Sequence, residues 1–191
     1  MRREVMWVPW TGPGLEHLRL TEGESVVEVD GLIVGLDEGR SYRAQYALSC
    51  DKAWRVREVR VAVSDPVPHL LNLMTDGSGK WTTAGGELLP QFAGCLDVDL
   101  SATPFTNTLP IRRLGLGAGV STELTLVYVK LPSLSLSVAR QRYTRLETSD
   151  GAEWYRFESL PSGFTADLQV DHDGLVLDYP GLFHRVWSSG N

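Results

Sequence analysis

Apolar and polar residues alternate with a period of two along most of the chain, which is the pattern of half-buried β-strands. Residues 41–50 and 54–63 show this alternation most clearly. In the second segment the apolar register slips between Val56 and Val59, and a β-bulge near Arg57–Glu58 would account for the slip. Further strands are predicted at residues 14–20, 24–35, 80–83, 123–131, 134–146, 153–158, 164–170, 175–179 and 182–187.

Turn-forming residues separate these segments at intervals of roughly ten residues, as in all-β, mostly antiparallel proteins. Asp30–Gly31 is a strong hairpin dipeptide, so residues 24–35 fit either one strand or two. Residues 65–74 are ambiguous, because their prolines indicate a loop or an edge strand, whereas Leu70–Met74 fits a strand or a short helical turn. The sequence has no repeat of fixed period, which argues against propellers and solenoids.

One stretch, residues 101–117, departs from the strand period. Asn107 or Thr108 can act as an N-cap there, and Pro110 suits the first turn of a helix. Gly115 follows the apolar segment, so together these residues predict one short α-helix. A helix about 10 Å across would fill the concave face of a large curled sheet. Its apolar side chains are expected to face the sheet: Leu109, Ile111 and Leu114.

Several sequence blocks form a recognisable set. The strongest are GCLDVDLSATPFTNTLPIRRL (94–114), GFTADLQVD (163–171) and GLVLDYPGLFHRV (174–186), and EHLRL (16–20) and DKAWRVREVRV (51–61) are weaker. Together they resemble a little-characterised bacterial family of glycolipid-binding proteins, over most of the chain. The resemblance implies a mainly β fold, a spiral β-roll in which one large antiparallel sheet is rolled around one short α-helix. It also implies binding or carriage of an amphipathic ligand.

Length and charge limit the class of protein. The 191 residues fit one domain, 1–191, in which residues 188–191 are expected to form a frayed tail. The formal net charge of −6 comes from interspersed acids and bases, which argues against nucleic acid as the partner. No apolar run approaches the ~20 residues that a transmembrane helix needs, so no transmembrane segment is expected.

The sequence also suggests a compartment. The N-terminal residues are basic, but Pro9 and Gly12 interrupt any apolar segment, so no signal peptide is expected and a cytoplasmic location is favoured. Cys50 and Cys95 lie in strand-like segments and are expected to be buried, reduced thiols. The four histidines are scattered, and no P-loop, dinucleotide fingerprint or GxSxG motif occurs, so neither a metal nor a cofactor is expected.

Asp97 and Asp99 project from one face of the strand that precedes the predicted helix. Residues two apart on a strand are about 6.5–7 Å apart, which is within the range of the carboxylate pair of an inverting glycosidase. Metal binding would be another role for such a pair. Because this spacing recurs by chance, the favoured interpretation is that both acids are solvated or paired with Arg112 and Arg113.

The two arginines themselves have two interpretations. Arg112 and Arg113 could hold a phosphate or carboxylate headgroup through bidentate hydrogen bonds, or form internal ion pairs that fix the helix. The polar run before them, which includes Thr106 and Asn107, could line a sugar site. Capping of the helix is the favoured role for that run.

Aromatic residues provide further candidates. The chain has six tryptophans, and tryptophan either stacks on sugar faces and lines acyl grooves or packs in the core. Trp10 is the tryptophan singled out for a ligand, and Tyr128, Tyr143 and Gln141 could contribute polar contacts at the mouth of a site. Glu16 is either a site acid or an ordinary polar residue of an exposed strand face.

Two functional hypotheses follow. The favoured one is a non-enzymatic binding or carrier protein for a glycolipid or other amphipathic ligand, held between sheet and helix. The alternative is a hydrolase acting on a glycoside or ester through Asp97 and Asp99 or through Glu16. The candidate ligand-binding residues are Trp10, Glu16, Asp97, Asp99, Thr106, Asn107, Arg112, Arg113, Tyr128 and Tyr143.

Overall fold

The computed structural model describes residues 1–64, 68–148 and 151–189. Its strands form a 14-stranded sheet in the order β7-β6-β5-β4-β3-β2-β1-β14-β13-β12-β11-β10-β9-β8. The strands are β1 (Arg2–Pro9), β2 (Leu15–Glu22), β3 (Val26–Asp37), β4 (Arg40–Asp51), β5 (Val56–Val63), β6 (His69–Thr75), β7 (Trp81–Thr83), β8 (Asp97–Leu100), β9 (Ser121–Lys130), β10 (Ser135–Arg145), β11 (Glu153–Ser159), β12 (Thr165–Val170), β13 (Val176–Tyr179) and β14 (Phe183–Ser188). The helices are η1 (Pro90–Phe92), η2 (Phe105–Asn107) and α1 (Thr108–Leu114).

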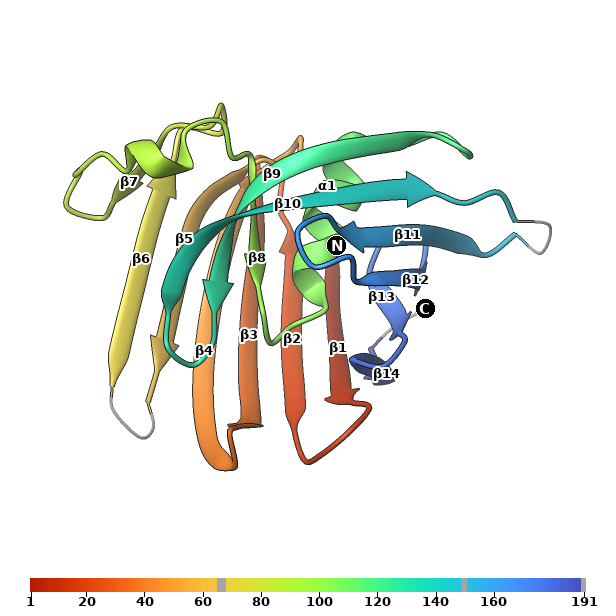
Figure 1. Cartoon of the computed structure of the whole chain (residues 1–191), viewed down its shortest axis with the longest axis horizontal. Coiled ribbons are helices and arrows are strands. Elements are labelled where there is room, and N and C mark those ends of the chain that lie inside the picture. The colour runs from red at the N-terminus through yellow and green to blue at the C-terminus, as the bar shows by residue number, and fades with distance from the viewer. Residues whose placement is uncertain (65–67, 149–150, 190–191) are drawn as a thin grey trace.

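The sheet consists of two meanders that meet at β1 and β14. Neighbouring strands in the described part of the chain are antiparallel, apart from β8, which pairs in parallel with β9. Figure 1 shows β9 and β10 crossing over β1 to β4, with α1 between the two layers. The predicted mainly β roll around one short helix is therefore confirmed.

The apolar core has two parts, and α1 contributes to both. Leu109 belongs to the larger part, where side chains of β1–β5 such as Trp7 pack against β8 and β9. Ile111 belongs to the smaller part, where it meets Tyr143, Phe157 and other side chains of β10–β13. The helix therefore faces sheet on two sides, as expected for an element enclosed by a rolled sheet.

The helix boundaries follow the sequence signals. Asn107 is the N-cap, Pro110 lies in the first turn, and Gly115 ends the helix with a left-handed φ of 53°. Leu109 and Ile111 are buried, and Leu114 is half-buried against the smaller core.

The strand predictions hold in most details. Cys50 pairs with Val56 and Ser49 pairs with Glu58, which leaves Arg57 as the extra residue of the predicted bulge. Of residues 24–35, residues 26–35 belong to one continuous strand, β3, so Asp30–Gly31 is not a turn.

Other predictions concern the less regular segments. Residues 69–75 are a strand, β6, whereas the expected loop at 65–67 lies outside the described residues. The prediction of a frayed tail from residue 188 is wrong for its first part, because Ser188 pairs with Val5 and Ser189 donates its backbone N–H to Glu4. Residues 190–191 lie outside the described residues.

Cys50 and Cys95 are buried free thiols, as expected, and burial raises the pKa of Cys50 to about 12. In the described part of the chain, no helix combines the length and the apolar character required to cross a bilayer.

Candidate ligand-binding site

A half-open hollow with a volume of about 330 Å³ lies on the inner side of the roll. One wall comes from β1 to β4 and from the β1–β2 loop, and the other from β9 and the turn after β8. The wall is partly apolar and partly polar, which is the usual composition of a small-molecule site. Its lining residues include Trp7, Glu16, Ile33, Gly35, Asp37, Tyr42, Ser101, Ala102, Tyr128 and Lys130.

A second hollow of about 470 Å³ is its neighbour. The two hollows share Ser101, Tyr128 and Phe183 as lining residues. The wall of the second hollow is more apolar and includes aromatic side chains of β11 to β13, with a polar group of side chains from β8, η2 and β10. These lining residues are Asp99, Asn107, Gln141, Phe157, Phe164 and Tyr179.

Glu16 is a buried acid in the wall of the first hollow, with only 2% of its surface exposed. Both of its hydrogen bonds reach the same carboxyl oxygen: Tyr46 donates to Oε1 at 2.5 Å and Thr103 donates to Oε1 at 2.7 Å. The other oxygen, Oε2, is buried without a hydrogen-bond partner. Burial raises the pKa of Glu16 to about 8, although the two hydrogen bonds oppose the increase.

Glycines of β3 allow two tyrosines of β4 to reach this wall. Gly31 pairs with Tyr46, and a Cβ atom on Gly31 would lie 2.1 Å from the Tyr46 ring. Gly35 pairs with Tyr42, and its Cβ would lie 3.2 Å from that ring. The Tyr46 ring therefore lies across β3 and reaches Glu16 on β2 because position 31 has no side chain.

Asp99 is held in the wall of the second hollow with both oxygens occupied. Thr106 donates to Oδ1 at 2.8 Å, and Gln141 donates to Oδ2 at 2.7 Å. Burial raises the pKa of Asp99, and these two hydrogen bonds oppose the increase.

The polar run before α1 binds the sheet and does not cap the helix through side chains. Asn107 makes no side-chain capping bond; it donates from Nδ2 to the Pro104 carbonyl and accepts a 2.7 Å hydrogen bond from Tyr143 at Oδ1. Thr108 donates to the Gly174 carbonyl at 2.9 Å. Asn107 is the N-cap residue by position, but the favoured interpretation that this run caps α1 through its side chains is wrong, because Asn107 and Thr108 bind β10 and the β12–β13 loop.

Asp97 and Arg113 form an internal ion pair. Asp97 is fully buried, and Arg113 donates to its two oxygens from Nε at 3.0 Å and from Nη2 at 2.5 Å. Asp97 and Asp99 therefore have separate partners, and Asp97 lines neither hollow. For Asp97 this is the ion pair with a helix arginine that the sequence favoured, whereas Asp99 is buried and bonded to Thr106 and Gln141, so it is neither solvated nor paired with an arginine.

Arg112 is also engaged away from the hollows. It donates to Glu22 at 3.2 Å and to the Asp173 carbonyl at 3.2 Å, and its guanidinium lies 4.7 Å from the centre of the Trp54 ring. Neither Arg112 nor Arg113 lines the hollows described above. Both arginines therefore fix the helix to its surroundings.

The remaining sequence candidates are divided between the site and its surroundings. Tyr128 lines both hollows, whereas Tyr143 is buried behind the second one, against Asn107. Trp10 is 49% exposed outside the hollows, with its ring 5.0 Å from that of His184.

Sequence reasoning did not identify Tyr42 and Tyr46 as site residues. Their signal was a pair of glycines inside a strand pattern, since strand glycines often mark a close approach. The burial of Glu16 could have been predicted from the alternation of the strand. Glu16 lies on the same face of β2 as Leu18 and Leu20, which are buried.

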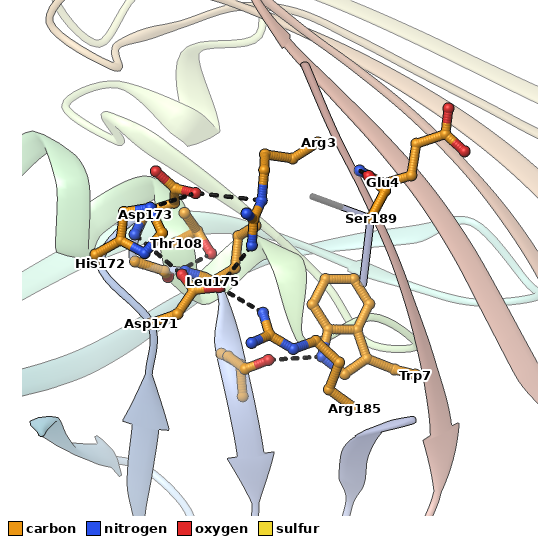
Figure 2. A network of polar contacts seen from close by, with 12 residues as sticks. Arg3, Glu4, Trp7, Thr108, Asp171, His172, Asp173, Leu175, Arg185 and Ser189 are labelled. Atoms are coloured by element: carbon orange, nitrogen blue, oxygen red, sulfur yellow. Dashed lines mark hydrogen bonds and ion pairs between the residues drawn. The ribbon is translucent and has the colours of Figure 1, made fainter. Parts of the chain in front are cut away.

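A cluster of charged residues closes the seam where β1 meets β14 (Figure 2). Asp171 accepts from Arg185 at 2.5 Å and lies 3.5 Å from Arg3, whose Nε atom is 3.3 Å from Asp173. His172 lies 3.3 Å from Asp173. Ligand atoms of residues 171–173 lie within 4.8 Å of one another, but the arginines already supply the positive charge that a metal would bring. The cluster is best explained as a structural ion-pair network that links β1, β14 and the β12–β13 loop.

The family model described as "Putative glycolipid-binding" matches residues 4–185. The chain belongs to this family. The fold of this family member is similar to the crystal structure of a DUF1089 family protein from Pseudomonas aeruginosa, and the two sequences are 41% identical. The structural match covers 93% of the present chain and 95% of the Pseudomonas aeruginosa chain, with a TM-score of 0.82. No curated protein matches the chain.

Proposed function

We propose that this family member binds an amphipathic, glycolipid-like molecule in the two neighbouring hollows and does not transform it. The observation that carries the proposal is the first hollow, where apolar side chains such as Trp7 and Ile33 adjoin the buried carboxyl group of Glu16. A wall that combines apolar side chains with fixed polar groups suits a ligand that has an oily part and a polar part.

The different composition of the two hollows suggests how such a ligand lies. The second hollow offers Phe157, Phe164 and Tyr179 to an acyl chain. The first hollow offers Glu16 and Tyr42 to a sugar or an ester group. Ser101 and Tyr128 belong to both walls and would contact the junction between the two parts of the ligand.

The first test is extraction of the purified protein with organic solvent, followed by mass spectrometry. A lipid retained in stoichiometric amount supports binding. The second test is calorimetric titration with n-octyl-β-D-glucoside below its critical micelle concentration. Ala102 lines the first hollow, so Ala102→Phe is expected to weaken binding by about tenfold or more because the ring fills the space.

Ala118→Phe is the matched control, because Ala118 is exposed and lies outside both hollows. This variant is expected to bind octyl glucoside like the wild type. If no lipid is retained and the wild type gives no binding heat, or if both variants weaken binding equally, the proposed site is wrong.

The hydrolase alternative depends on Glu16, because its carboxyl group is buried in the wall of the first hollow and keeps one oxygen without a hydrogen-bond partner. Asp97 is occupied by Arg113, and Asp99 has hydrogen bonds at both oxygens. The binding proposal predicts no turnover of nitrophenyl glycosides or nitrophenyl esters. Turnover that disappears in Glu16→Gln would instead establish the hydrolase.

A further inference from the structure

We propose that Glu16 acts in this site as a neutral carboxylic acid, whose Oε2–H group donates a hydrogen bond to an uncharged oxygen of the ligand. Such an oxygen belongs to a sugar hydroxyl, a sugar ring or an ester carbonyl. Binding would then be lost when Glu16 ionises. The inference rests on the proposed binding function and adds to it the chemical class of the contact and its control by pH.

The hydrogen bonds of Glu16 indicate which oxygen carries the proton. Oε1 accepts from both Tyr46 and Thr103, so its two lone pairs are occupied. The Thr103 hydroxyl itself accepts the backbone N–H of Phe105 at 3.0 Å, which leaves its own proton for Glu16. A proton on the carboxyl group therefore resides on Oε2, which is buried and has no partner within the protein.

The elements packed around Glu16 supply neutral groups. Tyr46 comes from β4, Thr103 from the segment after β8, and Tyr42 from the same wall of the hollow. Trp7 and Ile33 are its register partners on β1 and β3.

Two charged residues line the same hollow at its rim. Lys130 is exposed on β9, and Asp37 is half-buried at the end of β3. Neither contributes to the raised pKa of Glu16, which comes from burial. The acid is therefore mostly protonated at pH 7.

The protonated form fits an uncharged ligand group. Oε2 is the one Glu16 oxygen without a hydrogen bond, so a ligand acceptor would satisfy a donor that is buried without a partner. An ionised Glu16 would present a desolvated negative charge, which repels phosphate and carboxylate headgroups and cannot donate. The site should consequently prefer neutral glycosides and esters at pH 7.

The test is calorimetric titration with n-octyl-β-D-glucoside between pH 6 and pH 9.5. Wild-type affinity should be constant at low pH and fall by up to about tenfold per pH unit above pH 8, because only the protonated form binds. Glu16→Gln keeps an acceptor and a donor without a charge. It should bind less tightly than the wild type at pH 6, by less than about tenfold, with no dependence on pH.

Glu16→Ala should lose about tenfold or more at pH 6 and show no pH dependence, because it has no donor. Glu24→Gln is the matched control at an exposed glutamate, and it should reproduce the wild-type pH profile. Wild-type affinity that does not change with pH, with retained binding by Glu16→Ala, would overturn the inference and leave the binding function intact. Absence of wild-type binding at every pH would overturn the binding function and the inference with it.

A measurement without ligand tests the protonation state directly. The side-chain carboxyl carbon of Glu16, assigned by comparison with Glu16→Gln in ¹³C-glutamate-labelled protein, should titrate by NMR with a midpoint near 8. A midpoint near the ordinary glutamate value of 4.5 would show an ionised acid at pH 7 and would overturn the inference, whatever the protein binds.

Discussion

The carboxyl group of Glu16 illustrates how partners distant in sequence determine the state of one side chain. Its hydrogen-bond donors, Tyr46 and Thr103, lie 30 and 87 positions away in the sequence. Burial raises its pKa from 4.5 to about 8, so the folded protein holds this proton more tightly than the unfolded chain. The contribution of Glu16 to stability is therefore complete below about pH 4.5 and is lost as the pH rises through 8.

Glu16→Gln should remove this pH dependence. The wild-type free energy of unfolding should lose up to about 1.4 kcal/mol per pH unit from this group between pH 4.5 and 8, while the variant loses nothing from it. Urea unfolding at pH 5 and at pH 8.5 measures the difference. The exposed-site control Glu24→Gln should parallel the wild type, and a parallel curve for Glu16→Gln would contradict the raised pKa.

Two aromatic side chains of β4 pack against glycine residues of β3. Tyr46 lies across Gly31 and Tyr42 lies against Gly35, so the strand has glycine where its neighbour has a ring. The position of Tyr46 then sets the position of its hydroxyl group beside Glu16. The local shape of the candidate site therefore depends on the absence of side chains from one strand.

Gly31→Ala should disturb this arrangement. Its Cβ would lie 2.1 Å from the Tyr46 ring, so the ring must move and the hydrogen bond to Glu16 must lengthen. We expect a loss of about 1–3 kcal/mol in the free energy of unfolding, measured with urea. Gly85→Ala is the control, since its Cβ would meet only ordinary contact at 3.7 Å. Equal stability of the two variants would contradict the role assigned to Gly31.

Local sequence signals predicted the elements well, because strand period, bulge and helix ends depend on neighbouring residues. The bulge at Arg57 and the left-handed Gly115 are examples. The same local signals left open whether one strand or two surround Asp30–Gly31, because the reason for Gly31 is a ring on the next strand. They also assigned the polar run before α1 to capping, although Asn107 and its neighbours bind strands that only the fold brings close.

Two buried charged contacts of the whole molecule differ in how far the sequence predicted them. Arg113 pairs with Asp97, which the sequence suggested, whereas the cluster of Arg3, Asp171 and Arg185 joins the two chain ends and has no local signal. This cluster lies where the two meanders of the sheet meet (Figure 2). The side chains of Arg3, Asp171 and Arg185 are only 9%, 12% and 11% exposed, so the loss of one charge leaves the others poorly solvated.

Asp171→Asn should therefore destabilise the protein strongly. Asparagine retains an oxygen for the backbone N–H groups of Asp173 and Leu175 but removes the charge opposite Arg185. The expected loss is about 3 kcal/mol, measured by urea unfolding. Asp167→Asn is the matched control, because its partner Arg156 is 47% exposed and such pairs contribute less than about 1 kcal/mol. Equal losses of unfolding free energy in the two variants would show that the buried cluster does not stabilise the fold more than an exposed ion pair does.

The position of the first and last strands has a consequence for biosynthesis. β1 and β14 are neighbours in the middle of the sheet, while its two edges, β7 and β8, are close together in the sequence. A nascent chain can thus assemble β1 to β7 early, but β1 remains an open edge until β14 has been synthesised and pairs with it. Phe183 of β14 lines both hollows, so their walls are complete, and a ligand can be retained there, only after β14 has taken its place in the sheet.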